Sequence, residues 1–288
     1  NNMIQSMTGF GKASLQLPTK KITVEIKSLN SKGLDLNTRM PSVFREMELG
    51  LRNQISQRLE RGKVDFSLYV EVTGEETTSK INVPIIKGYI NQMKAVIPNA
   101  DETELMKMAV RMPDALKTER DEIDENEWKQ IQTVIDEALE NIANFRKDEG
   151  ASLEKEFQLR ISNINNLMNE AVSYDAERVE TVKTRLRTAL DELKVNVDEN
   201  RFEQELIFYL EKYDITEEKV RLGNHLNYFL ETLNGTEANG RKLGFITQEM
   251  GREINTMGSK SNQKKKKKLV VMMKDELEKI KEQVLNVL

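Results

Sequence analysis

The feature that most constrains this fold is the stretch from residue 127 to residue 194, which contains almost no helix-breaking residues. Its apolar side chains recur at steps of three and four, as they do along one face of an α-helix. Examples are Ile131, Ile135, Leu139 and Ile142, and later Ile161, Ile164, Leu167, Met168 and Ala171. The pattern predicts long helices, and an antiparallel pair is the most economical arrangement for them.

The chain before this stretch has a different pattern, in which short alternating segments are mixed with helical ones. Alternation of apolar and polar residues is typical of a strand with one buried face, whereas apolar residues at every fourth position indicate a helix. The predicted elements are strands at 22–27 and 64–72, helices at 42–61 and about 84–97, and either a prolonged or a separate strand at 34–37. Residues 3–113 are therefore expected to form a mixed α/β domain.

The chain after the long stretch is expected to be helical. The predicted helices lie at about 199–212, 216–233 and 241–257, with a last one reaching residue 287, and a glycine-rich loop at 234–240. The whole chain is thus expected to be α+β. A mixed α/β domain at 3–113 is followed by a long helical hairpin or connector at 114–198 and an all-α domain at 199–288.

The composition excludes several classes of protein. The chain has no cysteine, which rules out disulfides and thiolate metal sites and fits a reducing compartment. No apolar run approaches the roughly 20 residues that a membrane span needs, and no secretory signal is visible. The net charge of -4 means that a nucleic-acid binder of this composition would have to gather its basic residues on one surface. A soluble cytoplasmic protein is expected.

The only histidine, His225, lies on a predicted helix whose apolar stripe includes Leu222 and Phe229. Glu218, Arg221 and His225 fall one turn apart on a neighbouring polar stripe. A histidine in this position can simply pack beside Phe229. It can also serve as a general base or a metal ligand, because neutral imidazole does both.

Two carboxylates on the next helix raise a similar choice. Glu249 and Glu253 are four residues apart, and like charges at that spacing repel unless a cation lies between them. Arg252 or Lys242 could supply that cation. A divalent ion is the alternative, because Mg²⁺ and Mn²⁺ prefer carboxylate oxygens, and one histidine with two glutamates would suit Mn²⁺ better.

Basic and polar residues in the predicted loops of the first domain offer a surface for a phosphate backbone. They are Lys12, Asn30, Lys32, Arg61 and Lys63. Each of them can equally well be a solvated charge.

Several motifs along the chain resemble those of the YicC/YloC family of bacterial proteins. They are Met7–Ala13 (MTGFGKA), Arg201–Glu205, Asp214–Glu218, Gly240–Phe245, Gln248–Thr256, Gly258–Asn262 and Lys279–Val284. The resemblance covers essentially the whole chain and implies an N-terminal α/β domain and a helical C-terminal domain. It further implies an endoribonuclease that requires a divalent ion, best Mn²⁺, and that assembles as a homohexamer whose ring opens to admit RNA. Some members are treated as RNA-decay adaptors, so a non-catalytic RNA-binding scaffold is the alternative.

The resemblance unites three weak signals into one candidate site. It implies that His225, Glu249 and Glu253 hold the metal, with Glu218 and Gln248 as second-rank members. The metal would activate a water or the RNA 2′-hydroxyl, and His225 or Glu249 would take the proton. Arg252 would help neutralise the phosphate oxygens, and Arg241 joins the residues expected to bind RNA.

The chain departs from the family pattern at several positions, and two of these departures concern its C-terminal helices. Gly223, Gly244 and Gly251 stand where relatives more often carry polar residues, and each interrupts a predicted helix. Lys264–Lys268 replaces an acidic helix start, and Lys266 falls on the apolar stripe of the last helix. Adjacent lysines repel one another and carry the wrong sign for a helix N-terminus, so poor order is expected at 263–268.

Overall fold

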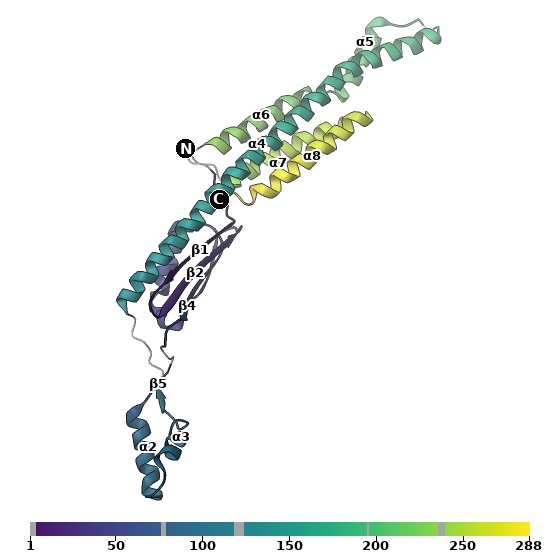
Figure 1. Ribbon diagram of the computed structural model, residues 1–288. Coiled ribbons are helices and arrows are strands. Elements are labelled where there is room, and N and C mark those ends of the chain that lie inside the picture. Colours follow the sequence, from purple (N-terminus) through teal and green to yellow (C-terminus); the bar gives the residue numbers. More distant parts are fainter. Residues whose placement is uncertain (1–3, 76–78, 118–123, 195, 236–239) are drawn as a thin grey trace.

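The computed structural model describes residues 4–75, 79–117, 124–194, 196–235 and 240–288. The fold is α+β, as predicted, with a small mixed sheet and a two-stranded sheet in the N-terminal part, followed from residue 125 by helices. Figure 1 shows an elongated molecule in which one long helix, α4 (Glu125–Glu192), runs beside the sheet and then beside the C-terminal helices. Within the described ranges, no helix is long and apolar enough to span a membrane.

The sheet has four strands in the order β1-β2-β4-β3. They are β1 (Gly9–Gln16), β2 (Lys20–Leu29), β3 (Leu34–Arg39) and β4 (Gly62–Val72). The first two pairings are antiparallel, and β3 runs parallel to β4, so residues 34–37 belong to a separate strand. The helix predicted at 42–61 consists of a 3₁₀ segment, η1 (Ser42–Met47), and helix α1 (Glu48–Leu59).

One face of the sheet is buried against α1 and the first half of α4. The alternating residues of β2 point Ile22, Val24 and Ile26 into this core, where all three are fully buried. Strand β1 approaches α4 closely because of Gly11, where a Cβ atom would stand only 2.7 Å from the backbone nitrogen of Ile142. The opposite face of the sheet is left open to solvent.

Arg146 of α4 joins the ends of the sheet to the helix from within the core. Its guanidinium donates to the carbonyl oxygens of Leu59 (2.8 Å), Arg61 (3.0 Å) and Met7 (3.1 Å), and to the hydroxyl of Ser28 (3.3 Å). Burial away from water lowers the pKa of Arg146 to about 10. The side chain is thus a hydrogen-bonding hub among four segments of the backbone.

The prediction of an antiparallel helix pair within 127–194 is wrong, because the whole stretch forms the single helix α4. Its apolar stripe changes partner along its length: Ile131–Ile142 packs on the sheet, and Leu153–Ala171 packs on the C-terminal helices. Gly150, between the two, remains helical while the carbonyl of Ile4 crosses it in close contact. Partners that come from distant parts of the chain therefore replace the expected hairpin.

The second half of α4 forms a four-helix bundle with three later helices. These are α6 (Thr216–Asn234), α7 (Gly240–Ser259) and α8 (Lys264–Val284). Helix α5 (Glu199–Lys212) lies along the far end of α4 (Figure 1). The predicted helix positions are confirmed to within a few residues, whereas most of the loop expected at 234–240 lies outside the described residues.

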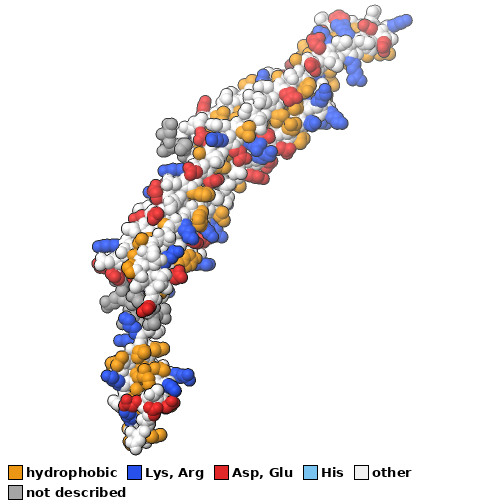
Figure 2. Space-filling view, in the orientation of Figure 1, with side chains coloured by type: hydrophobic (Ala, Val, Ile, Leu, Met, Phe, Trp, Pro, Cys, Tyr) orange, Lys and Arg blue, Asp and Glu red, His pale blue; other side chains and the backbone are white. Residues whose placement is uncertain are grey.

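A small unit of two helices extends from the sheet at the opposite end of the molecule (Figure 1). It comprises β5 (Lys80–Ile81), α2 (Val83–Val96), α3 (Glu102–Ala109) and β6 (Leu116–Lys117). Its core is small, with Ile86, Ala109 and Ala115 buried. Apolar side chains gather on its surface (Figure 2). The exposed apolar residues of this unit include Val96 and Ile97.

The expectation of poor order at 263–268 is also wrong. Helix α8 begins at Lys264, and Lys266 is only 1% exposed. Its amine forms an ion pair with Asp175 of α4, which a buried cation requires, while the neighbouring lysines of the run point into solvent. The long lysine stem fills the place of an apolar side chain and carries its charge to a defined partner.

Candidate functional site on helices α6 and α7

Helices α6 and α7 pack side by side in the bundle. Their apolar stripes interlock through Leu222, Leu226, Phe229 and Leu233 of α6 and Leu243, Ile246, Met250, Ile254 and Met257 of α7, all buried. The stripes follow helical spacing, so the polar residues beside them line the edges of the α6–α7 contact. Every member of the predicted metal set lies on one of these two helices.

An ion pair between Arg221 and Glu253 bridges the two helices and shows which of their turns lie side by side. The guanidinium nitrogen Nη1 of Arg221 lies 3.7 Å from Oε1 of Glu253, which is only 7% exposed. The two helices are consecutive and antiparallel. One turn after Arg221 on α6 is His225, and one turn before Glu253 on α7 is Glu249, so these two half-buried residues come to the same level. From helix geometry and this ion pair, we infer that the two predicted residues lie at about the same height of the bundle.

Glu249 is half-buried and has its own cation. Its Oε1 atom lies 3.6 Å from Nε of Arg252, three residues further along α7, while Gln248 is exposed. Of the two cations that the sequence offered, Arg252 and Lys242, it is Arg252 that pairs with Glu249, whereas Glu253 pairs with Arg221. Both partners of this ion pair keep contact with solvent, so the carboxylate and the guanidinium remain accessible to a ligand.

Glu218 is buried at the start of α6, one turn before Arg221. Its Oε1 accepts a hydrogen bond of 2.6 Å from Lys260, which follows α7. Its Oε2 atom is buried and has no hydrogen-bond partner among the described residues. Nearby, Asp214 precedes α6: burial raises the pKa of its carboxyl, but hydrogen bonds from Thr216 outweigh burial, so that its pKa is lowered.

The predicted metal ligands do not form a three-ligand group. Among the described residues, no three His, Asp or Glu side chains lie close enough together to hold a metal ion. Each predicted carboxylate instead faces a cation: Glu218 faces Lys260, Glu249 faces Arg252 and Glu253 faces Arg221. The arrangement is a row of ion pairs, and it does not fit a metal that the protein alone would hold.

The residues predicted to bind RNA are spread over the molecule. Lys12 and Lys63 lie on the open face of the sheet, and Asn30 and Lys32 are exposed in the β2–β3 connection. Arg61 is half-buried and donates to the carbonyl of residue 287. Arg241 is exposed in the first turn of α7, and Figure 2 shows acidic and basic side chains intermixed along the visible face.

The sequence did not predict two of the cations that pair with the carboxylates of the site, Arg221 and Lys260. Arg221 pairs with Glu217 one turn earlier, as its spacing would suggest, and the helix packing adds the contact with Glu253. Lys260 lies 42 residues from Glu218, and no local pattern connects them.

Two family descriptions together match most of the chain. Residues 4–155 match the family described as endoribonuclease YicC-like, N-terminal region, and residues 171–288 match endoribonuclease YicC-like, C-terminal. A protein of Clostridioides difficile (strain 630) named probable endoribonuclease YicC is 33% identical over 293 residues, which cover 99% of this chain and 100% of that protein. A protein of Haemophilus influenzae with the same name is 29% identical over 287 residues, 99% of each chain.

Proposed function

We propose, from the premise that this chain belongs to the YicC-like endoribonuclease family, that it cleaves phosphodiester bonds within RNA and takes part in RNA decay. The observation that carries the proposal is the register of α6 and α7, which brings His225 level with Glu249 and the cation Arg252. An imidazole, a carboxylate and a guanidinium on adjoining helices are the groups that phosphoryl transfer needs. They can accept a proton and neutralise phosphate charge.

In this proposal the residues divide the work according to their exposure. Glu249 or His225 accepts the proton of the attacking hydroxyl, which belongs either to water or to the RNA 2′ position. The attacking oxygen bonds to phosphorus while the bond to the leaving oxygen breaks. Arg252, exposed beside Glu249, neutralises the non-bridging phosphate oxygens. Buried Glu253 holds Arg221 in place across the helix contact.

A requirement for a divalent cation, with Mn²⁺ preferred over Mg²⁺, is part of the proposal. Since the described residues lack a three-ligand group, RNA phosphates and water would have to complete the coordination. Hard divalent cations are commonly held in this way, by one or two carboxylates together with substrate phosphates. Glu249 is the most accessible of the three predicted carboxylates.

The test is cleavage of a structured RNA with Mn²⁺, with Mg²⁺ and with EDTA. Wild type should cut with Mn²⁺ and stop in EDTA, while His225→Ala and Glu249→Gln should lose about 10²–10⁴-fold in rate, as expected for loss of a general base. Glu278→Gln is a matched control, because Glu278 is an exposed α8 glutamate paired with Lys281 at 3.5 Å. If His225→Ala and Glu249→Gln cut as well as the control, the residue assignment is wrong. If the wild type cleaves RNA neither with Mn²⁺ nor with Mg²⁺, the proposed nuclease activity is refuted.

One observation favours a second candidate, a non-catalytic RNA-binding adaptor. The pairing of all three predicted carboxylates with cations gives them a structural role that needs no chemistry. An adaptor would bind RNA in a salt-sensitive manner that survives EDTA. It would leave the RNA intact in every metal, so the same experiment separates the two functions.

Self-association, expected as a homohexamer, completes the proposal. Support comes from large apolar side chains that the single chain leaves exposed. They include two adjacent pairs, Ile207 with Phe208 on α5 and Val96 with Ile97 at the end of α2. Exposed apolar groups of this size on monomeric proteins mark interaction surfaces when they lie together. Sedimentation at several protein concentrations tests the stoichiometry, and a monomer throughout would refute it.

A further inference from the structure

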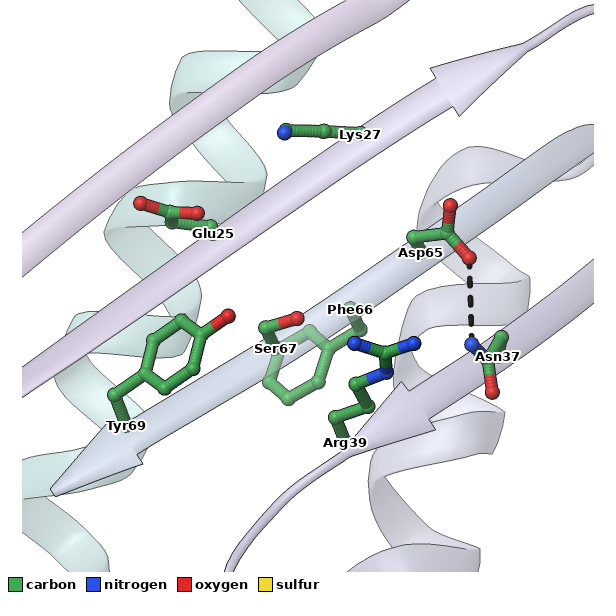
Figure 3. Close-up of a pocket in the computed structure, with 8 residues that line it drawn as sticks. All are labelled: Glu25, Lys27, Asn37, Arg39, Asp65, Phe66, Ser67 and Tyr69. Atoms are coloured by element: carbon green, nitrogen blue, oxygen red, sulfur yellow. Dashed lines mark hydrogen bonds between the residues drawn. The ribbon is translucent and has the colours of Figure 1, made fainter.

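The open face of the sheet carries a polar hollow that the candidate site on α6 and α7 does not use. The hollow has a volume of about 210 Å³ and lies over β2, β3 and β4 (Figure 3). Its lining consists of Glu25, Lys27, Asn37, Arg39, Asp65, Phe66, Ser67 and Tyr69. Apart from Phe66, whose ring is buried in the core below, these are outward-facing residues of alternating strand positions.

The strand register arranges the outward side chains in rows across the sheet. Lys27 of β2 stands between Phe10 of β1 and Asp65 of β4, and the next row includes Ser67 beside Arg39. Tyr69 follows two residues later along β4. From the usual strand spacings, Phe10 and Tyr69 are roughly 16 Å apart. Lys27 lies beside Phe10 on β2, and Arg39 lies on β3, on the other side of β4.

The charges in the hollow leave two cations available. Glu25 already pairs with Lys12 at 3.4 Å, and Asp65 accepts a hydrogen bond of 3.5 Å from Asn37, drawn as a dashed line in Figure 3. Within the part of the chain that the structure describes, Lys27 and Arg39 form no ion pair. An anionic ligand can therefore bind this guanidinium and this ammonium group without first breaking an ion pair with a carboxylate.

Aromatic rings flank these cations and are unusually accessible. Tyr69 is 51% exposed and Phe10 is 40% exposed, and the amine of Lys27 lies 6.0 Å from the centre of the Phe10 ring. Exposed rings on a β-sheet face, interleaved with cations, are the means by which four-stranded sheets stack the bases of single-stranded RNA. Tyr69 lines the hollow and Phe10 lies beside Lys27 at its edge, so rings and cations are available on the same face.

We propose that this sheet face holds single-stranded RNA, with bases stacked on Tyr69 and Phe10 and backbone phosphates on Arg39 and Lys27. The inference rests on RNA being the substrate in the proposed function, and it names the unpaired form as the part of the substrate that is held. Lys12 and Lys63, predicted from the sequence to contact RNA, lie on the same face. The RNA-holding surface is thus separate from the α6–α7 site.

The test measures binding of a short fluorescent oligouridine by anisotropy in EDTA. Tyr69→Leu and Phe10→Leu should each weaken binding about tenfold, because stacking is lost while an apolar strand residue is kept. Tyr69→Phe should bind as wild type does. Arg39→Gln and Lys27→Gln should each reduce the slope of log K against log salt by about 0.7. Circular dichroism checks that each variant is folded.

Matched controls come from the opposite end of the molecule. Phe208→Leu removes a more exposed ring from α5, and Lys268→Gln removes one exposed charge from α8; neither should change affinity. The proposal is overturned if Tyr69→Leu and Phe10→Leu bind as wild type does, or if Phe208→Leu weakens binding equally. It is also overturned if Tyr69→Leu dissociates an oligomer without changing RNA affinity, since the face would then bind another copy of the chain.

Comparison with the cleavage assay separates the two proposals. If the wild type cleaves RNA and Tyr69→Leu cleaves it with an unchanged KM, RNA binding by the sheet face is refuted, and the proposed function stands. Binding that Tyr69→Leu weakens, without cleavage in any metal, supports the sheet face and refutes the nuclease. A wild type that neither binds nor cleaves RNA refutes both.

Discussion

Replacing two helix-interior glycines by alanine should change stability in opposite directions. Alanine is favoured over glycine in a helix interior by up to about 1 kcal/mol, so the local term stabilises both variants. A Cβ at Gly223 of α6 meets nothing within 4 Å. Gly223→Ala should therefore raise the free energy of unfolding by up to about 1 kcal/mol.

The same change at Gly150 of α4 meets the backbone of the N-terminal segment. The added Cβ would lie 2.7 Å from the carbonyl carbon of Ile4 and closer still to its oxygen, so this segment must move. Movement weakens the burial of Ile4, worth about 1.5–3 kcal/mol. It also weakens the backbone hydrogen bonds of Ser6 to Arg146 (3.0 Å) and of Met7 to the chain near its C-terminal end (2.7 Å), worth about 1 kcal/mol each.

After the helical gain is subtracted, Gly150→Ala should lower the free energy of unfolding by about 2–4 kcal/mol. Urea unfolding followed by circular dichroism measures both variants against wild type, and Trp128 fluorescence reports the half of α4 beside the sheet. A Gly150→Ala midpoint equal to or above that of Gly223→Ala would refute the reasoning. It would mean that the N-terminal segment does not press on α4.

Four further substitutions test the remaining features. Lys266→Met should leave stability unchanged or raise it, whereas Asp175→Ala, which strands the buried amine, should cost about 3–5 kcal/mol in urea unfolding. Arg146→Met should also lower the urea midpoint, because the four hydrogen bonds that its guanidinium donates in the core are lost. A hydrogen bond from Thr38 holds the pKa of Glu48 below its ordinary value of 4.5, so this carboxylate stabilises the fold above that pH and ceases to do so as pH falls. Glu48→Gln should accordingly differ more from wild type in unfolding free energy at pH 7 than at pH 3, and equal differences at both would contradict the assignment.

The fold class and the C-terminal helices could be predicted from the sequence because their apolar periodicity is strong. The predicted helix at 199–212 has the observed bounds, and the others agree to within a few residues. The continuity of α4 could not be predicted in the same way. Periodicity shows that Leu153 and Ile142 face a core but does not say which one, and the economical hairpin supplied the wrong partner.

The candidate site shows the same division between local and distant contacts. The sequence offers Arg252 or Lys242 as the cation beside Glu249 and Glu253, and the structure pairs Arg252 with Glu249. The contact of Arg221 with Glu253 depends on how two helices pack, so the sequence leaves it open. Lys266 was expected to disorder its segment because its charge was considered without Asp175, which lies 91 residues away.

Figure 3 shows Arg39 on β3, a strand that the alternation at 34–37 only half predicted. Its place in the hollow follows from the parallel register that sets it opposite Ser67 of β4. Sequence alternation can assign a side chain to one face of a strand. It cannot say which residues of other strands will lie beside it, and so the hollow was missed.

The unbroken course of α4 also gives the molecule a fixed spacing. The last sheet-facing residue of its core, Ile142, and the first bundle-facing one, Leu153, are joined by helix that rises about 1.5 Å per residue. The sheet and the bundle that carries the α6–α7 site therefore pack on one continuous helix, which sets the distance between them. If the sheet face holds a strand of RNA and the α6–α7 site cleaves it, the length of α4 sets how far the cleaved bond lies from the held bases. The nucleotide sequence would then not determine the position of the cut.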